Sequence, residues 1–137
     1  SVIPQGQTGL SSLTVIENVM VPALMYKSDN DREERAIKLL EAMDIAGLKN
    51  VYANELSGGE LRRMAIARAL INEPQIIIAD EPTGDLDDET TNMVLKLLKS
   101  YCVDNNASVL MVTHEKEAVS YADAVYRMDK GKLIKEE

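Results

Sequence analysis

A turn of small residues, a helix-forming run and an apolar strand that ends in two carboxylates follow one another in the middle of this chain of 137 residues. The turn reads LSGGE at residues 56–60, and the strand with its acids reads IIIADE at residues 76–81. Serine and glycine leave backbone N–H groups uncrowded at the start of a helix, where the helix dipole favours an anion. This order of elements predicts an α/β fold in which a phosphate contacts the turn.

The run after the turn is predicted to be an amphipathic helix. Its apolar residues recur at helical spacing from residue 61 to residue 71, and the positions between them carry Arg62, Arg63 and Arg68. Pro74 ends the run, since proline has no N–H to continue a helix. We therefore expect one apolar helix face and one charged face.

Residues 76–79 are predicted to be a strand buried on both faces of a parallel sheet. They show no polar alternation and are rich in β-branched residues. Asp80 and Glu81 then follow at the C-terminal end of the strand, which is where ligands bind in open α/β sheets. A carboxylate at that end can hold a Mg²⁺ ion that bridges phosphates.

The motifs and their order resemble the ATP-binding cassette (ABC) ATPases over nearly the whole chain. Residues 56–60 match the family's signature motif and residues 76–81 its Walker B strand. Gln5, nine positions before Thr14, resembles the Q-loop glutamine, and the run TGDLD at residues 83–87 resembles the D-loop. His114, after an apolar strand at residues 108–113, resembles the switch histidine.

The resemblance implies ATP and Mg²⁺ as cofactors and assigns roles to residues. Asp80 would hold Mg²⁺ directly or through water, and Glu81 would be the general base or would position the attacking water. His114 would contact the γ-phosphate or orient Glu81, and Gln5 would touch Mg²⁺ or the attacking water. The residues that would close on the nucleotide are Leu56, Ser57, Gly58, Gly59, Glu60 and Asp87.

Each of these residues also has a simpler interpretation. The small-residue turn is an ordinary loop in most proteins, and the two acids are solvated carboxylates at a strand end. His114 is the only histidine and could lie on the surface without a catalytic role. Gln5 follows Pro4, where the family usually has an aromatic residue, and Asp87 could simply be an N-cap.

One family motif is absent from these 137 residues. A phosphate-binding Walker A loop needs Gly, four residues and then Gly-Lys-Ser/Thr, whereas the only Gly-Lys pair, at Gly131, is followed by Leu133. In the family this loop lies upstream of the Q-loop. We therefore expect the chain to be the C-terminal part of a longer ATPase and to be inactive alone, with a natural degenerate cassette as the alternative.

The predicted architecture is a partial P-loop NTPase (RecA-like) core with parallel strands, plus an all-helical ABC signature subdomain. Residues 1–72 would form the Q-loop and helical subdomain, and residues 73–137 the C-terminal half of the nucleotide-binding core. Thr14 with Glu17, and Asn30 with Glu33, have the spacing of capping boxes. The first helix would run to about Met25 with a kink at Pro22, and the second would stop near Gly47.

The C-terminal half alternates strands with helices. The expected order is a helix at residues 88–103, a buried strand at 109–112, a short helix at 115–121 and a hairpin of strands at 124–128 and 132–135. Because strands of the sheet would lack neighbours on one flank, we expect unpaired edges, exposed apolar surface and self-association.

Composition excludes some classes of protein. With 45% hydrophobic and 28% charged residues the chain suits a folded core, and no window is apolar enough for a membrane-spanning helix. A formal charge of −8 argues against nonspecific nucleic-acid binding. One cysteine and no visible signal peptide make the cytoplasm the default compartment.

The resemblance is greatest to the group of ABC subunits that serve lipoprotein release, cell division and macrolide export. It implies an ATP-hydrolysing subunit that dimerises head to tail with a second ATPase subunit and binds a transmembrane permease at the inner face of the membrane. One alternative is a chromosome-structure or DNA-repair ATPase, although the 57−5 = 52 positions between Gln5 and Ser57 carry no sustained heptads. Another is a non-catalytic oligomerising module.

Overall fold

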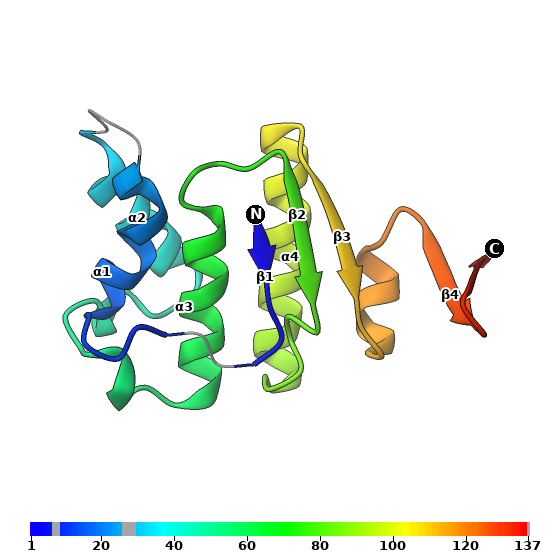
Figure 1. Cartoon of the computed structure of the whole chain (residues 1–137), viewed down its shortest axis with the longest axis horizontal. Helices are drawn as coiled ribbons and strands as arrows, with labels where there is room; N and C mark the ends of the chain where they lie inside the picture. Colours follow the sequence, from blue (N-terminus) through cyan, green and yellow to red (C-terminus); the bar gives the residue numbers. More distant parts are fainter. Residues whose placement is uncertain (7–8, 26–29, 137) are drawn as a thin grey trace.

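The structure, a computed structural model, describes residues 1–6, 9–25 and 30–136. A group of helices lies on one side of a small parallel sheet, and a hairpin lies at the other end of the molecule (Figure 1). The helical group contains α1 (Val15–Met20), α2 (Arg32–Ala42) and α3 (Gly58–Leu70). The hairpin pairs β4 (Val125–Asp129) with β5 (Lys132–Glu136) in antiparallel fashion, as predicted.

The sheet has the order β1-β2-β3, and its strands are parallel. β2 (Ile76–Asp80) is central and β3 (Ser108–Val112) pairs with one of its edges, which confirms the two predicted parallel strands. β1 (Val2–Ile3) pairs with the other edge and was not predicted as a strand. Two residues carry too little pattern to be recognised, so β1 is defined only by its pairing with β2.

The predictions that β2 is buried on both faces and that the strand at residues 109–112 is buried were wrong, since Leu110 of β3 is 65% exposed. Ile77 is 0% exposed, whereas Ile78 is 46% exposed. Helix α4 (Asp88–Asn105) lies behind β2 and β3 in Figure 1, and the opposite face carries no element among the described residues. A run of β-branched residues shows that a strand is apolar but not whether a second layer covers it.

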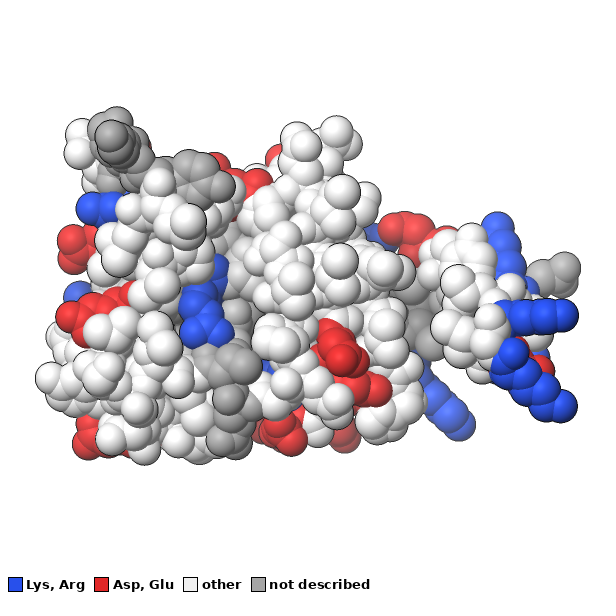
Figure 2. All heavy atoms as spheres, viewed as in Figure 1, with Lys and Arg blue, Asp and Glu red and all other residues white. Residues whose placement is uncertain are grey.

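We call this open side the apolar sheet face. Val2, Ile78 and Leu110 lie in register across the three strands. Figure 2 shows that the atoms over the sheet are uncharged, with acidic atoms beside them. The exposed apolar residues of this face are Val2, Ile76, Ile78, Leu110 and Val112.

Helix α1 begins as predicted and α2 does not. Thr14 and Glu17 form the expected capping box, and after Met20 the chain passes into a 3₁₀ turn that contains Pro22, η1 (Val21–Met25). The N-cap of α2 is Asp31 and not Asn30, and its side chain makes no capping bond. The helix ends at Ala42 rather than near Gly47, because Asp44 takes the left-handed conformation, with φ of 55°.

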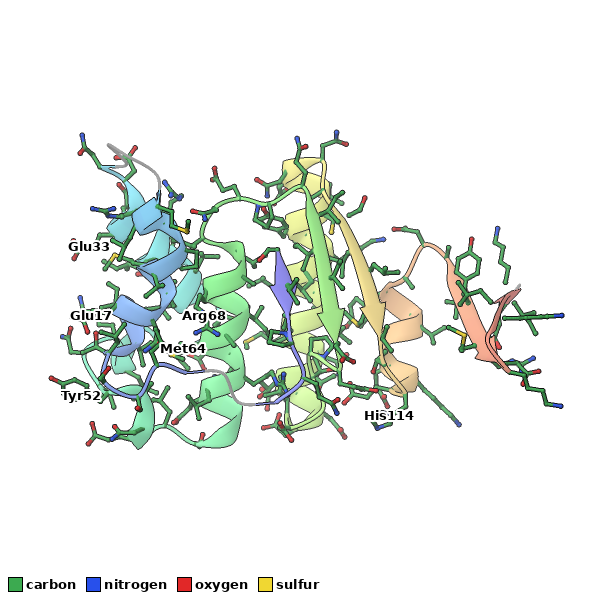
Figure 3. All side chains as sticks on the ribbon, viewed as in Figure 1. Glu17, Glu33, Tyr52, Met64, Arg68 and His114 are labelled. Carbon is green, nitrogen blue, oxygen red and sulfur yellow. The ribbon has the colours of Figure 1, made fainter. Side chains whose placement is uncertain are left out.

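The amphipathic interpretation of α3 was also wrong. The helix contacts α1, α2 and β1, so apolar residues around most of its circumference are buried. Arg62, which the sequence placed on a charged face, is only 3% exposed. Helical spacing cannot reveal this burial, because the covering elements come from distant parts of the chain. Figure 3 shows Met64 and Arg68 of α3 directed toward the neighbouring helices.

One continuous apolar core joins the helical group to the sheet. It includes Val19 of α1, Leu40 of α2, Ile66 of α3, Ile77 of β2 and Leu98 of α4. Short 3₁₀ segments at Ala46–Leu48, Ala53–Glu55 and Lys116–Tyr121 complete the described elements. None of the helices in the described ranges is long and apolar enough to cross a membrane.

The arrangement brings several termini to one edge of the molecule. β1, β2 and β3 run in the same direction, so their C-terminal ends meet at this edge. The N-termini of α3 and α4 lie at the same end (Figure 1). Residues that follow the strands and residues that begin these helices are therefore close enough to form one site.

Candidate active site

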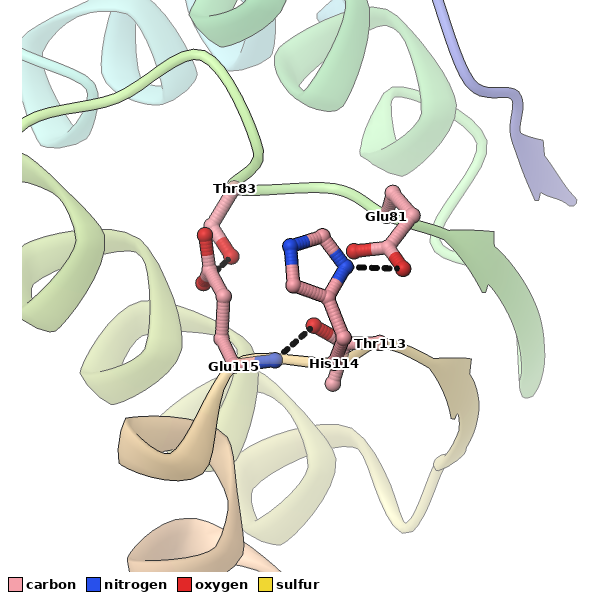
Figure 4. Close-up of polar contacts among 5 residues, drawn as sticks. All are labelled: Glu81, Thr83, Thr113, His114 and Glu115. Carbon is pink, nitrogen blue, oxygen red and sulfur yellow. Dashed lines mark hydrogen bonds and ion pairs between the residues drawn. The ribbon is translucent and has the colours of Figure 1, made fainter. Parts of the chain in front are cut away.

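The ends of β2 and β3 bring Glu81 and His114 into contact. Nδ1 of His114 lies 2.8 Å from Oε1 of Glu81 (Figure 4). The strand register explains this proximity, because Asp80 and Val112 are paired and each side chain follows shortly after its strand. Figure 3 shows His114 at the end of β3.

Glu81 has a backbone conformation that is uncommon for a residue with a side chain. Its φ is 46°, in the left-handed region. Its N–H donates to the carbonyl of Val112 over 2.8 Å, which fixes the residue as the chain leaves β2. Backbone strain of this kind is concentrated at functional sites. It turns Glu81 out of the strand and lets its carboxylate meet His114.

The two side chains differ in their exposure to solvent. The Glu81 side chain is 17% exposed and that of His114 is 83% exposed. Oε2 of Glu81 is buried and accepts no hydrogen bond from any described residue. The hydrogen bond to Glu81 and then the charge of Glu81 raise the pKa of His114 above its ordinary value. Glu81 therefore has one carboxylate oxygen on His114 and a second that can accept a proton or a ligand.

A second pair links the segments that follow β2 and β3. The hydroxyl of Thr83, which is fully buried, donates to the carboxylate of Glu115. The N–H of Glu115 donates to Oγ1 of Thr113 over 3.0 Å (Figure 4). Sequence analysis placed Thr83 in the D-loop and Glu115 at the start of a helix but did not pair them. The pair fixes the loop on which His114 stands.

Asp80 and Gln5 are the predicted metal ligands, and both are exposed. Asp80 is the last residue of β2, and Gln5 follows β1 by two positions. Within the described part of the chain, no hydrogen bond joins Gln5 to Asp80, Glu81 or His114, and no group of three or more His, Cys, Asp or Glu side chains is arranged to hold a metal. Residues 7 and 8 of the predicted Q-loop lie outside the described residues.

These donors nevertheless fit Mg²⁺. That ion is usually held by one or two carboxylates together with water and substrate phosphates, so a dedicated cage of side chains is not required. Asp80 offers an exposed carboxylate, and Glu81 beside it has a buried oxygen without a donor among the described residues.

The small-residue turn caps helix α3. Oγ of Ser57 accepts the N–H of Glu60 over 3.3 Å, and Oε2 of Glu60 accepts the N–H of Ser57 over 2.8 Å. Leu56 is half-buried against the core. Only Gly58 and Gly59 keep backbone N–H groups with no acceptor among the described residues, so the predicted set of anion donors is smaller than the whole turn.

Asp87 is the N-cap of α4. Its carboxylate accepts the N–H of Thr90 over 2.7 Å, and this hydrogen bond holds the pKa of Asp87 below its ordinary value. Asp87 is therefore an N-cap in the structure, which is the simpler of its two interpretations. Close by, a Cβ added to Gly59 would lie 3.5 Å from the Leu86 side chain, so the signature turn and the D-loop are neighbours.

Sequence comparison identifies relatives of the chain. A family model described as ABC transporter matches residues 1–84. The lipoprotein-releasing system ATP-binding protein LolD of Treponema denticola is 42% identical over 125 residues, which are 90% of this chain and 55% of that protein. The methionine import ATP-binding protein MetN of Lactobacillus acidophilus is 42% identical over 132 residues, which are 95% of this chain and 37% of that protein.

Solved structures that resemble this chain in fold are also ABC transporter cassettes. The dimeric bacterial ABC transporter cassette MJ0796 is 33% identical, with a TM-score of 0.88 over 96% of this chain and 59% of that chain. A dimeric post-hydrolysis state of the same cassette, bound to ADP and Pi, gives a TM-score of 0.90. The chain spans about half the length of the LolD relatives that it matches. The match to residues 1–84 covers more than half of the sequence, and the chain therefore belongs to the ABC transporter family with the fold of its ATPase cassette.

Proposed function

We propose that this chain is part of the ATP-hydrolysing subunit of an ABC transporter, of the group that includes the lipoprotein-releasing ATPases. The observation that carries this proposal is the contact of Glu81 with His114 at the C-terminal edge of the parallel sheet. A carboxylate with one oxygen on an imidazole and one oxygen without a donor is suited to accept a proton from water. Family membership supports ATP as the substrate.

Each residue then has a separate task. Glu81 would hold or deprotonate the attacking water through its second oxygen, which has no donor among the described residues, and His114 would keep that carboxylate in position and present its exposed ring to the phosphate. Asp80 and Gln5 would hold Mg²⁺, which supplies positive charge to the phosphate oxygens when it is bound. Thr83 and Glu115 fix the two loops on which the pair stands.

The signature turn would act on a second subunit. Gly58 and Gly59 present N–H groups at the start of α3, and Ser57 is held beside them by the capping box. The nucleotide closed by this turn would be one that a second subunit holds, since these 137 residues contain no Walker A sequence. The structural relative MJ0796 is a dimer, which supports a head-to-tail pair. By themselves the 137 residues are expected to be inactive.

A transmembrane permease is the second proposed partner. It would be gripped between the helical subdomain, residues 1–72, and the core, residues 73–137, and would hold the subunit at the inner face of the membrane. The named relatives LolD and MetN are ATP-binding proteins of release and import systems, which supports a transport role.

A chromosome-structure ATPase is the competing function, and the helices argue against it. The longest helix before the signature turn is α2, with 11 residues, so the described residues include no long coiled coil. Phosphate release from Mg-ATP by the full-length gene product, with and without double-stranded DNA, separates the two functions. We expect turnover that DNA does not change. Turnover that depends on DNA, or no turnover in the presence of its membrane partner, would contradict the proposal.

A further inference from the structure

Arg62 contacts two loops that are far apart in the sequence. Its Nη1 donates to the carbonyl of Pro4 over 2.7 Å, and its Nη2 lies 3.2 Å from Oδ2 of Asp85. The side chain is 3% exposed although it carries a charge. Pro4 immediately precedes Gln5, and Asp85 lies in the D-loop. One guanidinium therefore joins the loop after β1 to the loop after β2.

Burial makes these two contacts important for the arginine. A buried cation is stable only when it is paired and hydrogen-bonded. Asp85 is its ion-pair partner, and the third guanidinium nitrogen, Nε, has no acceptor among the described residues. The guanidinium group is thus held by hydrogen bonds to both loops. If one loop moves, the guanidinium group must move with it or lose its contact with the other loop, because its donors have a fixed relative geometry.

The position of Arg62 on α3 adds a third segment. Ser57 is the N-cap of the same helix and Gly59 lies in its first turn, where an added Cβ would come within 3.5 Å of the Leu86 side chain and 3.9 Å of the carbonyl of Asp85. On the two sides of Asp85 in the sequence, Thr83 is bonded to Glu115 and Asp87 caps α4. The D-loop is therefore held from both ends, and Arg62 is its connection to the loop that carries Gln5.

We propose that Arg62 is a positioning residue that couples the loop of Gln5 to the D-loop, so that a displacement of either loop is transmitted to the other. Its importance for hydrolysis rests on the proposed function, in which both loops belong to the ATP site. The coupling itself is a property of the folded chain and needs no nucleotide.

The test is a double-mutant cycle read by backbone amide NMR on the 137-residue chain. Asp85→Asn removes the ion pair with little change in shape, and Arg62→Met removes the guanidinium and keeps an unbranched side chain. We expect Asp85→Asn to shift the amide signals of Gln5 and Gly6 in the parent chain. In the Arg62→Met background the same substitution should leave those signals unchanged.

Asp123→Asn is the matched control. Asp123 also forms an ion pair, with Lys99, but it is highly exposed and lies outside this network. Asp123→Asn should shift neither the Gln5 nor the Gly6 amide signal. Arg62→Gln repeats the cycle if Arg62→Met fails to give a dispersed spectrum. Equal shifts with and without Arg62, or no shift of Gln5 and Gly6 on Asp85→Asn, would overturn the inference.

The outcome is independent of the proposed function. If the coupling is present and the full-length gene product hydrolyses no ATP, the proposed function fails and the coupling stands. If hydrolysis is present without coupling, Arg62 has only a packing role. If both hold, Asp85→Asn should lower kcat with little change in the KM for ATP, because Asp85 orients loops of the site.

Discussion

Oε1 of Glu81 lies 2.8 Å from Nδ1 of His114, although the two residues are 33 positions apart in the sequence. Parallel pairing of β2 with β3 makes this contact possible, and the left-handed backbone at Glu81 directs the carboxylate toward the ring. The contact leaves one carboxylate oxygen for a water molecule or a ligand. It is therefore the part of the structure that most constrains the chemistry of the site.

The first prediction concerns the pKa of His114. The hydrogen bond to Glu81 raises it above the ordinary value of 6.5. The contribution of the pair to stability is therefore complete below that value, and it is lost as pH rises through the raised pKa of the folded chain. Because His114 is the only histidine, a proton NMR titration gives a single imidazole curve. We expect its midpoint to lie above 6.5.

Glu81→Gln is the control for this titration. Glutamine keeps the size of the side chain and removes the charge, so the midpoint should fall toward the ordinary value. Glu117→Gln, which changes a carboxylate that does not contact the ring, should leave the midpoint in place. A midpoint that is unchanged by Glu81→Gln would show that the two side chains do not pair in solution.

The second prediction separates two roles of Ser57. Ser57→Ala removes the oxygen that caps α3 and should lower the free energy of unfolding by about 1 kcal/mol. Ser57→Asp keeps a capping oxygen, so stability in urea should be close to that of the parent. The added negative charge should still oppose a phosphate at this turn. Loss of stability in both variants would contradict the capping role.

The third prediction compares neighbouring residues on the two faces of β2. Ile77 is fully buried, so Ile77→Ala should lower the free energy of unfolding by about 2–5 kcal/mol. Ile78 lies on the apolar sheet face, and Ile78→Ala should cost about 1 kcal/mol or less. Urea unfolding at low protein concentration measures both. Similar losses would mean that the sheet face is covered in solution.

The fourth prediction is self-association through the apolar sheet face. Its exposed apolar side chains lie together on three strands, a surface that monomeric proteins rarely expose. Light scattering at tens of micromolar protein should show species larger than a monomer, and Leu110→Lys should reduce them. Met25→Lys, on an exposed residue outside the sheet, should not. A stable monomer in the parent chain would contradict this prediction.

Local patterns predicted those elements whose signals lie within a few residues. The capping box at Thr14, the apolar strands β2 and β3, and the hairpin all follow from short-range chemistry, whereas the capping box expected at Asn30 does not form. β1 was missed because its two residues form a strand only through pairing with β2. The open face of β2 was missed because a strand sequence does not show which layers pack against it.

The candidate site likewise contains residues that the sequence identifies and contacts that it does not. Glu81 and His114 could be identified from their positions after apolar strands. The bonds of Thr83 to Glu115 and of Arg62 to Asp85 could not, since they join residues 32 and 23 positions apart. Arg62 looked like a residue of a charged helix face, and only the packing of α3 against β1, α1 and α2 shows that it is buried.

The most direct test of the proposed base is Glu81→Gln in the full-length gene product. ATP binding and single-turnover hydrolysis are measured together, with Glu117→Gln as the control for a carboxylate outside the site. The expected result is that ATP binds as in the parent while hydrolysis falls by several orders of magnitude, because the amide cannot accept the proton of the attacking water. Hydrolysis at a rate close to that of the parent would contradict the role of Glu81.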